Sequence, residues 1–256
     1  MGKLQTTIQA WPKGTVATAN WLASLGVSRQ LCQKYMDSGW IKSIGYGAFV
    51  KAEDMPSWLG GVHALQQELP IHVGGITSLE LLGRAHFVPL GEGGQLYLYN
   101  HGGQLEVHIP KWYQQFFTNK AIQKYNLRLF KTEVGLQEYA TENFRVQISG
   151  VERALFEILA QVPKKIRFEY AAQLFEGQNT LRPELVQTLL EECRVERVKR
   201  LFLYLAREQQ LACFEHLNLK KVKLSANKIT IGDGSLYVSE FRLFVPQYVF
   251  DEEVGV

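Results

Sequence analysis

Residues 15–51 read TVATANWLASLGVSRQLCQKYMDSGWIKSIGYGAFVK, and this stretch decides the fold of the N-terminal part of the chain. It predicts a helix over residues 19–25, because Thr18 is a favourable N-cap residue just before it. A second helix is predicted over residues 29–38, with Ser28 as its N-cap and a glycine in the turn between the two helices. Two short helices joined by such a turn are typical of a helix-turn-helix.

Two short β-patterned runs follow the second helix, at residues 40–44 and 48–51, and Gly45-Tyr46-Gly47 joins them. Glycines in so short a connection indicate a tight turn, so the two runs predict a β-hairpin. A hairpin directly after the two helices would be the wing of a winged helix-turn-helix. The second helix would then be the element that reads DNA in the major groove.

The second predicted helix has two different faces. Leu31, Cys32 and Tyr35 share one apolar stripe, which is expected to pack against the first helix. The opposite face is polar and consists of Arg29, Gln30, Gln33 and Lys34. Arginine and glutamine match guanine and adenine edges, whereas lysine and the helix N-terminus suit phosphates. Any solvated helix has a polar face, but the hairpin that follows favours DNA binding.

Basic charge is concentrated at the N-terminus. Residues 1–53 hold six basic and two acidic side chains, a net charge of +4 within a chain total of +3, so the remainder carries −1. A basic N-terminal part beside a nearly neutral remainder fits a DNA-binding module with an appended domain. The length of 256 residues is sufficient for two domains, and 46% hydrophobic residues indicate a folded globular chain.

The sequence shows no motif for catalysis, a cofactor or a metal. Its six histidines lack metal-binding spacing, and there is no nucleophile-elbow motif or paired-carboxylate constellation. Gly74-Gly75 precedes a predicted helix, but the lysine and serine or threonine of a P-loop and the GxGxxG pattern are both missing. These glycines are therefore expected to permit close packing. Three cysteines without CxxC spacing, and no apolar run of 18 residues, predict a cytoplasmic protein with no membrane segment. We expect no enzyme activity, no cofactor and no metal.

The rest of the chain predicts a mixture of α and β structure. Residues 96–99 and 105–109 are expected to form one hairpin, and residues 228–231 and 236–245 a second one. Between them, from Gly150 onward, apolar residues at helical spacing predict a series of amphipathic helices. The expected fold class is α+β: an N-terminal winged helix-turn-helix, then a mixed α/β and mainly helical C-terminal domain.

Basic residues recur in the helical part of the chain. They are Lys164, Lys165, Arg167, Arg194, Arg197, Lys199, Arg200, Lys220, Lys221 and Lys223. Arg197 and Arg200 lie three positions apart, so part of this charge shares one helix face. Such a face could meet an acidic protein or an RNA. Alternatively, it is a solvated surface balanced by Glu191, Glu192 and Glu196.

Five segments, in order, resemble the AbiE-type antitoxins, the transcriptional-regulator partners in type IV, abortive-infection toxin–antitoxin systems. They are GVSRQLCQKYMDSGWIKSIGYGAFV (26–50), HVGGITSLELLG (72–83), SGVERALFEIL (149–159), PKKIRFEYAAQLFEGQNTLRPELVQTLLEECRVERVKRLFLYLA (163–206) and LYVSEFRLFVP (236–246). The similarity covers nearly the whole chain. The LRP…VKRLFL…LA part is the most specific, whereas many regulators share the helix-turn-helix.

The resemblance implies a bacterial cytoplasmic repressor that associates with the nucleoid when it binds inverted repeats of double-stranded DNA in its own promoter. It also implies a C-terminal domain that counters a neighbouring nucleotidyltransferase toxin, with direct contact left open. The expected domains are residues 1–95, with a core of 1–53 and a helical extension of 54–95, and residues 96–256.

Particular residues match the family pattern. Ser28, Arg29, Gln30, Gln33 and Lys34 match the recognition helix, and Lys42 and Tyr46 match the wing, where many members carry a basic residue instead of a tyrosine. With Thr18, these are the expected DNA-binding residues. Lys199 and Arg200 match a basic pair, and the expected antitoxicity surface is Arg194, Arg197, Lys199 and Arg200. The alternative function is a plain winged-helix repressor whose C-terminal half senses a ligand or dimerises.

Overall fold

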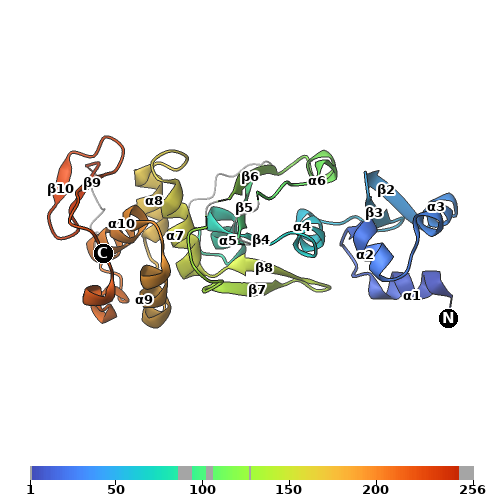
Figure 1. Cartoon of the computed structure of the whole chain (residues 1–256), viewed down its shortest axis with the longest axis horizontal. Helices are drawn as coiled ribbons and strands as arrows, with labels where there is room; N and C mark the ends of the chain where they lie inside the picture. The colour runs from blue at the N-terminus through green and yellow to red at the C-terminus, as the bar shows by residue number, and fades with distance from the viewer. Residues whose placement is uncertain (1, 86–93, 102–105, 127, 248–256) are drawn as a thin grey trace, which may run out of the picture. The chain divides into compact units, whose positions relative to one another are not determined.

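Figure 1 shows a computed structural model of the chain, in which residues 2–85, 94–101, 106–126 and 128–247 are described. The chain forms two compact units, and each is assembled from segments that are separate in the sequence. Unit 1 comprises residues 1–73, 90–126 and 138–148; unit 2 comprises residues 74–89, 127–137 and 149–256. Both units contain helices and strands, which confirms the predicted α+β class.

Unit 1 begins with the predicted pair of helices and the hairpin. The elements are α1 (Lys3–Ala10), β1 (Ala17–Thr18), α2 (Ala19–Ser24), α3 (Arg29–Asp37), β2 (Ile41–Gly45) and β3 (Ala48–Lys51). The hydroxyls of Thr18 and Ser28 accept hydrogen bonds from the amides of Trp21 and Leu31, as predicted for N-caps. Gly26, with φ of 73°, lies in the turn between α2 and α3. The predicted order of two short helices followed by a β-hairpin is thus confirmed.

An apolar core joins α2, α3 and the hairpin. Cys32 and Tyr35 of α3 are buried with Leu22 of α2, Trp11 and Ile41. β3 lies between β1 and β2 and is antiparallel to both. Fully burying one large apolar side chain stabilises a fold by about 1.5–3 kcal/mol, so this stripe sets the rotation of α3 about its axis. The opposite face of α3 is left toward solvent.

The rest of unit 1 is built on a five-stranded sheet in the order β6-β5-β4-β8-β7. The strands are β4 (Ile71–Val73), β5 (Gln95–Asn100), β6 (Ala121–Tyr125), β7 (Leu136–Ala140) and β8 (Arg145–Ser149). Two helices, α4 (Trp58–Gln66) and α6 (Lys111–Phe116), belong to the same unit. The central strand β4 pairs antiparallel with β5 and parallel with β8.

The predicted hairpin of residues 96–99 and 105–109 is wrong. β5 pairs in parallel with β6, whereas residues 106–109 form no strand and residue 105 lies outside the described residues. Side chains of the β6 segment hold that stretch instead: Lys124 donates to the Val107 carbonyl at 2.6 Å, and Asn126 accepts from the Val107 amide at 3.4 Å. Two parallel strands must be joined by a long connection. No short turn between β5 and β6 therefore marks their pairing in the sequence.

Unit 2 contains the predicted amphipathic helices. Those predicted after Gly150 are α7 (Val151–Gln161), α8 (Phe168–Phe175), α9 (Pro183–Glu192) and α10 (Glu196–Glu208). The unit also contains α5 (Gly75–Leu81) and 3₁₀ turns at Phe214–His216 and Leu219–Lys221. The rings of Phe156 on α7 and Phe202 on α10 stack with centroids 4.4 Å apart, and both are fully buried. α7 and α10 therefore form the centre of this unit's core.

A three-stranded sheet, in the order β10-β11-β9, ends the described part of unit 2. Its strands are β9 (Ile229–Thr230), β10 (Leu236–Val238) and β11 (Leu243–Val245). β11 is antiparallel to β10 and parallel to β9, so the single hairpin predicted around residues 232–234 is wrong. The reversal lies inside the predicted second strand, where Arg242 has φ of 50°. None of the helices in the described ranges could span a membrane, given their length and polarity.

Candidate nucleic-acid interface

The outer face of α3 carries the polar residues that the sequence singled out. Arg29, Gln30, Gln33 and Lys34 are all exposed to solvent. Gln33 donates from Nε2 to Asp37 Oδ1 at 2.8 Å, one turn further along the helix. The bond ties Gln33 to the acidic residue of α3, while Arg29 and Gln30 occupy the first turn. The first two turns of α3 thus present a guanidinium, two amides and an ammonium, which are the groups that bind base edges and phosphates.

The hairpin places Tyr46 at its tip, where the side chain is 96% exposed. Lys42 is also exposed, and its ammonium donates to the Ala52 carbonyl at 2.9 Å. A side chain at Gly45 would place its Cβ 2.6 Å from the Cβ of Trp112, so α6 packs directly against the end of β2. Only glycine permits this approach. Sequence reasoning did not foresee the contact, because nothing local links residue 45 to residue 112.

Thr18 was expected to contact DNA, and the structure corrects this. The residue is buried, its hydroxyl accepts from the Trp21 amide at 3.1 Å, and it donates to the Glu68 carboxylate. Both hydrogen-bonding functions of the hydroxyl are thereby used inside the protein. Thr18 caps α2 and is not part of the exposed face.

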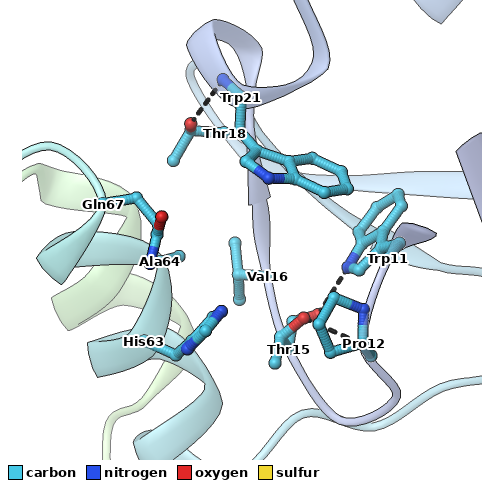
Figure 2. Close-up of a pocket in the computed structure, with 9 residues that line it drawn as sticks. All are labelled: Trp11, Pro12, Thr15, Val16, Thr18, Trp21, His63, Ala64 and Gln67. Atoms are coloured by element: carbon cyan, nitrogen blue, oxygen red, sulfur yellow. Dashed lines mark hydrogen bonds between the residues drawn. The ribbon is translucent and has the colours of Figure 1, made fainter. Parts of the chain in front are cut away.

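A small cavity lies between α2, α4 and the segment before β1 (Figure 2). It is lined by Trp11, Pro12, Thr15, Val16, Thr18, Trp21, His63, Ala64 and Gln67. Its volume is about 10 Å³, which is about the space of a single water molecule. The cavity is therefore too small for an effector molecule, and the exposed groups of α3 and the hairpin are the chemistry that this part of unit 1 offers.

The four basic residues expected to form an antitoxicity surface do not share one exposed face. Arg194 is exposed, whereas Arg197 is half-buried and donates from Nη2 to the Ala160 carbonyl at 3.0 Å. Lys199 is 6% exposed and Arg200 is fully buried. The assumption that Lys199 and Arg200 lie on a surface is corrected, because both side chains are buried, and segments after α10 hydrogen-bond to Arg200.

Arg200 is the centre of a hydrogen-bond network in unit 2. Its Nη1 donates to the carbonyls of Asn227, Phe241 and Arg242 at 2.8, 2.9 and 3.0 Å. Its Nη2 donates to the Ser225 carbonyl at 2.8 Å, and its Nε donates to Glu196 Oε1 at 3.0 Å. One guanidinium thus joins α10 to the segments before β9 and before β11. From the sequence alone, Arg200 was expected on a solvated surface, with Glu196 among the acidic residues that could balance its charge.

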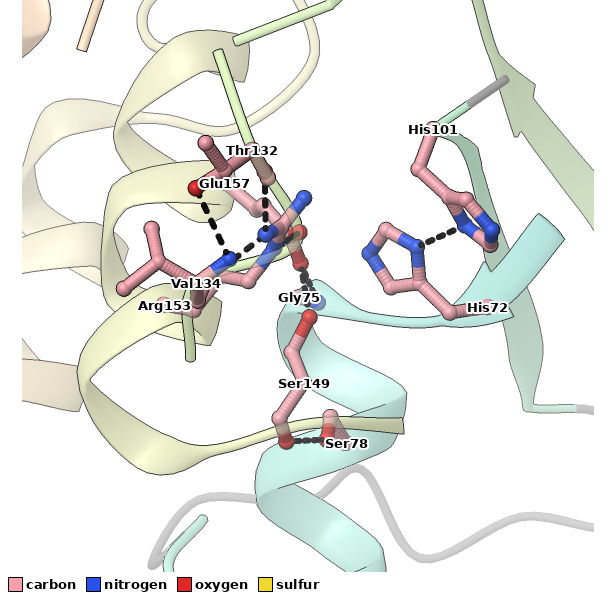
Figure 3. Close-up of polar contacts among 9 residues, drawn as sticks. All are labelled: His72, Gly75, Ser78, His101, Thr132, Val134, Ser149, Arg153 and Glu157. Atoms are coloured by element: carbon pink, nitrogen blue, oxygen red, sulfur yellow. Dashed lines mark hydrogen bonds and ion pairs between the residues drawn. The ribbon is translucent and has the colours of Figure 1, made fainter. Parts of the chain in front are cut away.

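A second buried ionic network, also missed by sequence reasoning, joins the three segments of unit 2 (Figure 3). Arg153 Nε donates to Glu157 Oε1 at 3.0 Å, and the two side chains are 5% and 1% exposed. Glu157 Oε2 accepts from the Gly75 amide at 3.0 Å and from the Ser149 hydroxyl at 2.7 Å. Arg153 Nη1 donates to the Val134 carbonyl at 2.7 Å. Because the two charged side chains are buried and paired with each other, the network stabilises the fold.

No metal centre is indicated in the described part of the chain, where no three metal-ligating side chains gather. Figure 3 also shows His72 and His101, whose Nδ1 atoms are 3.2 Å apart. They hydrogen-bond to each other, and two histidines alone are fewer ligands than a structural zinc site uses.

Comparisons with known proteins cover both parts of the chain. Residues 1–90 match the family model described as "Transcriptional regulator, AbiEi antitoxin N-terminal domain". Residues 95–246 match "Transcriptional regulator, AbiEi antitoxin, Type IV TA system". The crystal structure of the RV2827C protein from Mycobacterium tuberculosis is similar in fold, with a TM-score of 0.55 and 15% identity over 94% of this chain and 89% of that one. No curated protein matches the chain.

Proposed function

The chain belongs to the AbiEi family of transcriptional regulators, the antitoxins of type IV toxin–antitoxin systems, and on this premise we propose that it represses its own operon. The proposed ligand is an inverted repeat of double-stranded DNA in the promoter. α2 and α3 act as a helix-turn-helix, with α3 in the major groove and the β2–β3 hairpin as the wing. The observation that carries the proposal is the exposed face of α3, whose groups are those that recognise bases and phosphates.

Each residue of the interface has a proposed role. Arg29 and Gln30, in the first turn of α3, read base edges. Lys34 and Ser28 hold phosphates, and Gln33 reads a base after exchanging its bond to Asp37. Tyr46 and Lys42 contact the backbone from the wing, with the tyrosine hydroxyl donating where other members place a basic side chain. The concentration of basic charge in residues 1–53 supports salt-dependent binding.

Replacing Arg29 by Ala is expected to weaken operator binding by about 1–3 kcal/mol and to relax specificity at one base position, because a guanine edge loses its bidentate partner. Replacing Lys34 by Ala should instead weaken binding to all sequences alike and reduce the salt dependence. Gel shifts with the upstream DNA and with random duplex, at several salt concentrations, measure both effects. Lys165→Ala, an exposed lysine of unit 2, is the matched control. Equal affinity of the unaltered protein for upstream and random DNA would contradict the proposal.

We further propose that residues 96–256 counter a nucleotidyltransferase toxin encoded next to this chain, while residues 1–95 bind DNA. Because β4 lies between β5 and β8, removing residues 1–95 would take away a strand of the sheet. The division is therefore best tested by substitutions in the full chain. The alternative, a plain repressor whose C-terminal half senses a ligand or dimerises, predicts no rescue from any toxin.

Among the four basic residues considered for antitoxicity, Arg194 is the one whose side chain is open to solvent. Arg194→Glu should weaken the rescue of cells that express the neighbouring toxin, because an exposed guanidinium is available to carboxylates or phosphates of a partner. Operator binding should be unchanged. Arg167→Glu, a reversal at another exposed arginine of unit 2, should still rescue growth. Full rescue by the Arg194 variant at equal protein abundance would place the antitoxin surface elsewhere.

A further inference from the structure

Basic side chains converge where α10 begins, and this group plays no part in the proposed operator interface. The segment before β7 reaches the connection between α9 and α10 through two hydrogen bonds. The Arg194 amide donates to the Leu129 carbonyl at 2.9 Å. The Thr132 hydroxyl donates to Glu192 Oε2 at 2.6 Å. These bonds place the intervening Lys131, which is exposed, at the start of α10.

A second segment reaches the same place from the C-terminal side. The Ser225 amide donates to Glu196 Oε1 at 2.7 Å, and its carbonyl accepts from Arg200 Nη2 at 2.8 Å. Both partners lie in the first two turns of α10. Lys223, two residues before Ser225 and also exposed, is thereby held beside the same helix end.

Lys199, near the start of the same helix, is itself 6% exposed. Among the described residues, its ammonium has no hydrogen-bond or ion-pair partner. Burial lowers the pKa of Lys199; Cys193 and Glu196 oppose this, while Lys131 and Lys223 lower the pKa further. The positive charges of Lys131 and Lys223 thus act on the ammonium of Lys199. The stem of Lys199 is buried, but its ammonium still reaches solvent. Beside two like charges, this ammonium is favourably compensated by an anion.

The nearby carboxylates do not provide this compensation by direct contact. Glu192 accepts from Thr132, and Glu196 accepts from Arg200 and from the Ser225 amide. Arg194, exposed at the same junction, adds a further positive charge. Lys131, Arg194, Lys199, Arg200 and Lys223 thus outnumber Glu192 and Glu196 at this junction.

We propose that Lys131, Lys199 and Lys223 form a phosphate-binding site at the start of α10. A phosphate group suits this arrangement better than a carboxylate, because it carries more negative charge and offers oxygens in several directions to separate ammonium donors. The phosphate belongs to a nucleotide or to a nucleic-acid strand, since both present the same chemistry. The proposal goes beyond operator binding by α3 and does not depend on it.

The test titrates the full-length protein with three probes: inorganic pyrophosphate, ATP and a short fluorescent single-stranded RNA. Calorimetry measures the first two and fluorescence anisotropy the third. Lys199→Met keeps most of the apolar stem while removing the charge, so it should fold, and its melting temperature without the probe should be unchanged or higher. It should bind the preferred probe at least roughly tenfold more weakly, as expected for the loss of one charge-assisted contact.

Lys131→Gln and Lys223→Gln should each lower the affinity for the same probe by a smaller factor. The control is Lys164→Gln/Lys165→Gln, which removes two exposed charges elsewhere in unit 2 and should change affinity little. The Arg29→Ala variant should bind the probe normally although its binding to operator DNA is weakened. This difference would separate the phosphate site from the proposed DNA interface. Binding of pyrophosphate and ATP would identify a nucleotide as the source, and binding of RNA alone would identify a strand.

Absence of binding to all three probes would overturn the proposal. So would equal affinity of the Lys199 variant and the unaltered protein, or an equal loss in the control. A fall in the melting temperature of Lys199→Met without any probe, with affinity unchanged, would show that Lys199 has a purely structural role.

Discussion

Replacing Arg200 by Met is expected to lower the free energy of unfolding of unit 2 by about 3–5 kcal/mol, the usual cost of removing one partner from a buried ionic network. The guanidinium is fully buried and joins Glu196 to four backbone carbonyls. Methionine fills part of the volume but donates nothing, so the four carbonyls lose their donor, and the hydrogen bond to the Phe241 carbonyl is buried. Arg200→Lys should recover only part of the loss, because one ammonium cannot reach acceptors spread around a planar fork.

Urea unfolding and amide hydrogen exchange measure this effect. The backbone amides of β9 and β11 should lose protection against hydrogen exchange first, because these strands directly follow the carbonyls that accept from Arg200. The matched control is Arg194→Met, an exposed arginine of the same region, which should leave stability nearly unchanged. If the two variants unfold at the same urea concentration, the network does not stabilise the C-terminal sheet. The same reasoning makes Arg200 unsuitable for testing antitoxicity, because its charge reversal would unfold the region.

Replacing Glu157 by Leu is the second change with a large expected effect, a loss of about 3–5 kcal/mol, because it leaves the guanidinium of Arg153 buried without its carboxylate. The Gly75 amide and the Ser149 hydroxyl lose their acceptor at the same time. These two groups and Arg153 link residues from three separate segments of the chain. Loss of the carboxylate should therefore weaken unit 2 as a whole and not only α7.

A double-mutant cycle separates the ionic pair from simple packing. Arg153→Met/Glu157→Leu should be more stable than Glu157→Leu alone, since the second substitution removes the unpaired charge. Complete recovery is not expected, because the Val134 carbonyl loses the donor that it has in Arg153. Thermal and urea unfolding of the four proteins give the coupling energy. Additive losses in the double variant would show that the two charges do not stabilise each other.

The sequence by itself determined those features that depend on neighbours along the chain. Thr18 and Ser28 marked the helix starts, because a side chain that caps a helix acts within three residues. The apolar stripe of α3 and its exposed polar face followed from helical periodicity, which also placed Arg29 and Lys34 correctly. The amphipathic helices of unit 2 followed for the same reason, and the α+β class followed from the mixture of patterns.

Only the tertiary structure decided the features that depend on distant segments. Lys199 and Arg200 were expected on the surface, but both are buried, and the segments around residues 225 and 241 hydrogen-bond to Arg200. The parallel pairings of β5 with β6 and of β9 with β11 have no turn between them that a sequence could show. Thr18 changed from a DNA contact to a buried cap when Glu68 approached it. Each of these outcomes rests on contacts between residues far apart in the chain. Periodicity shows which side of a helix or strand is apolar, but it does not show which segment packs against the other side.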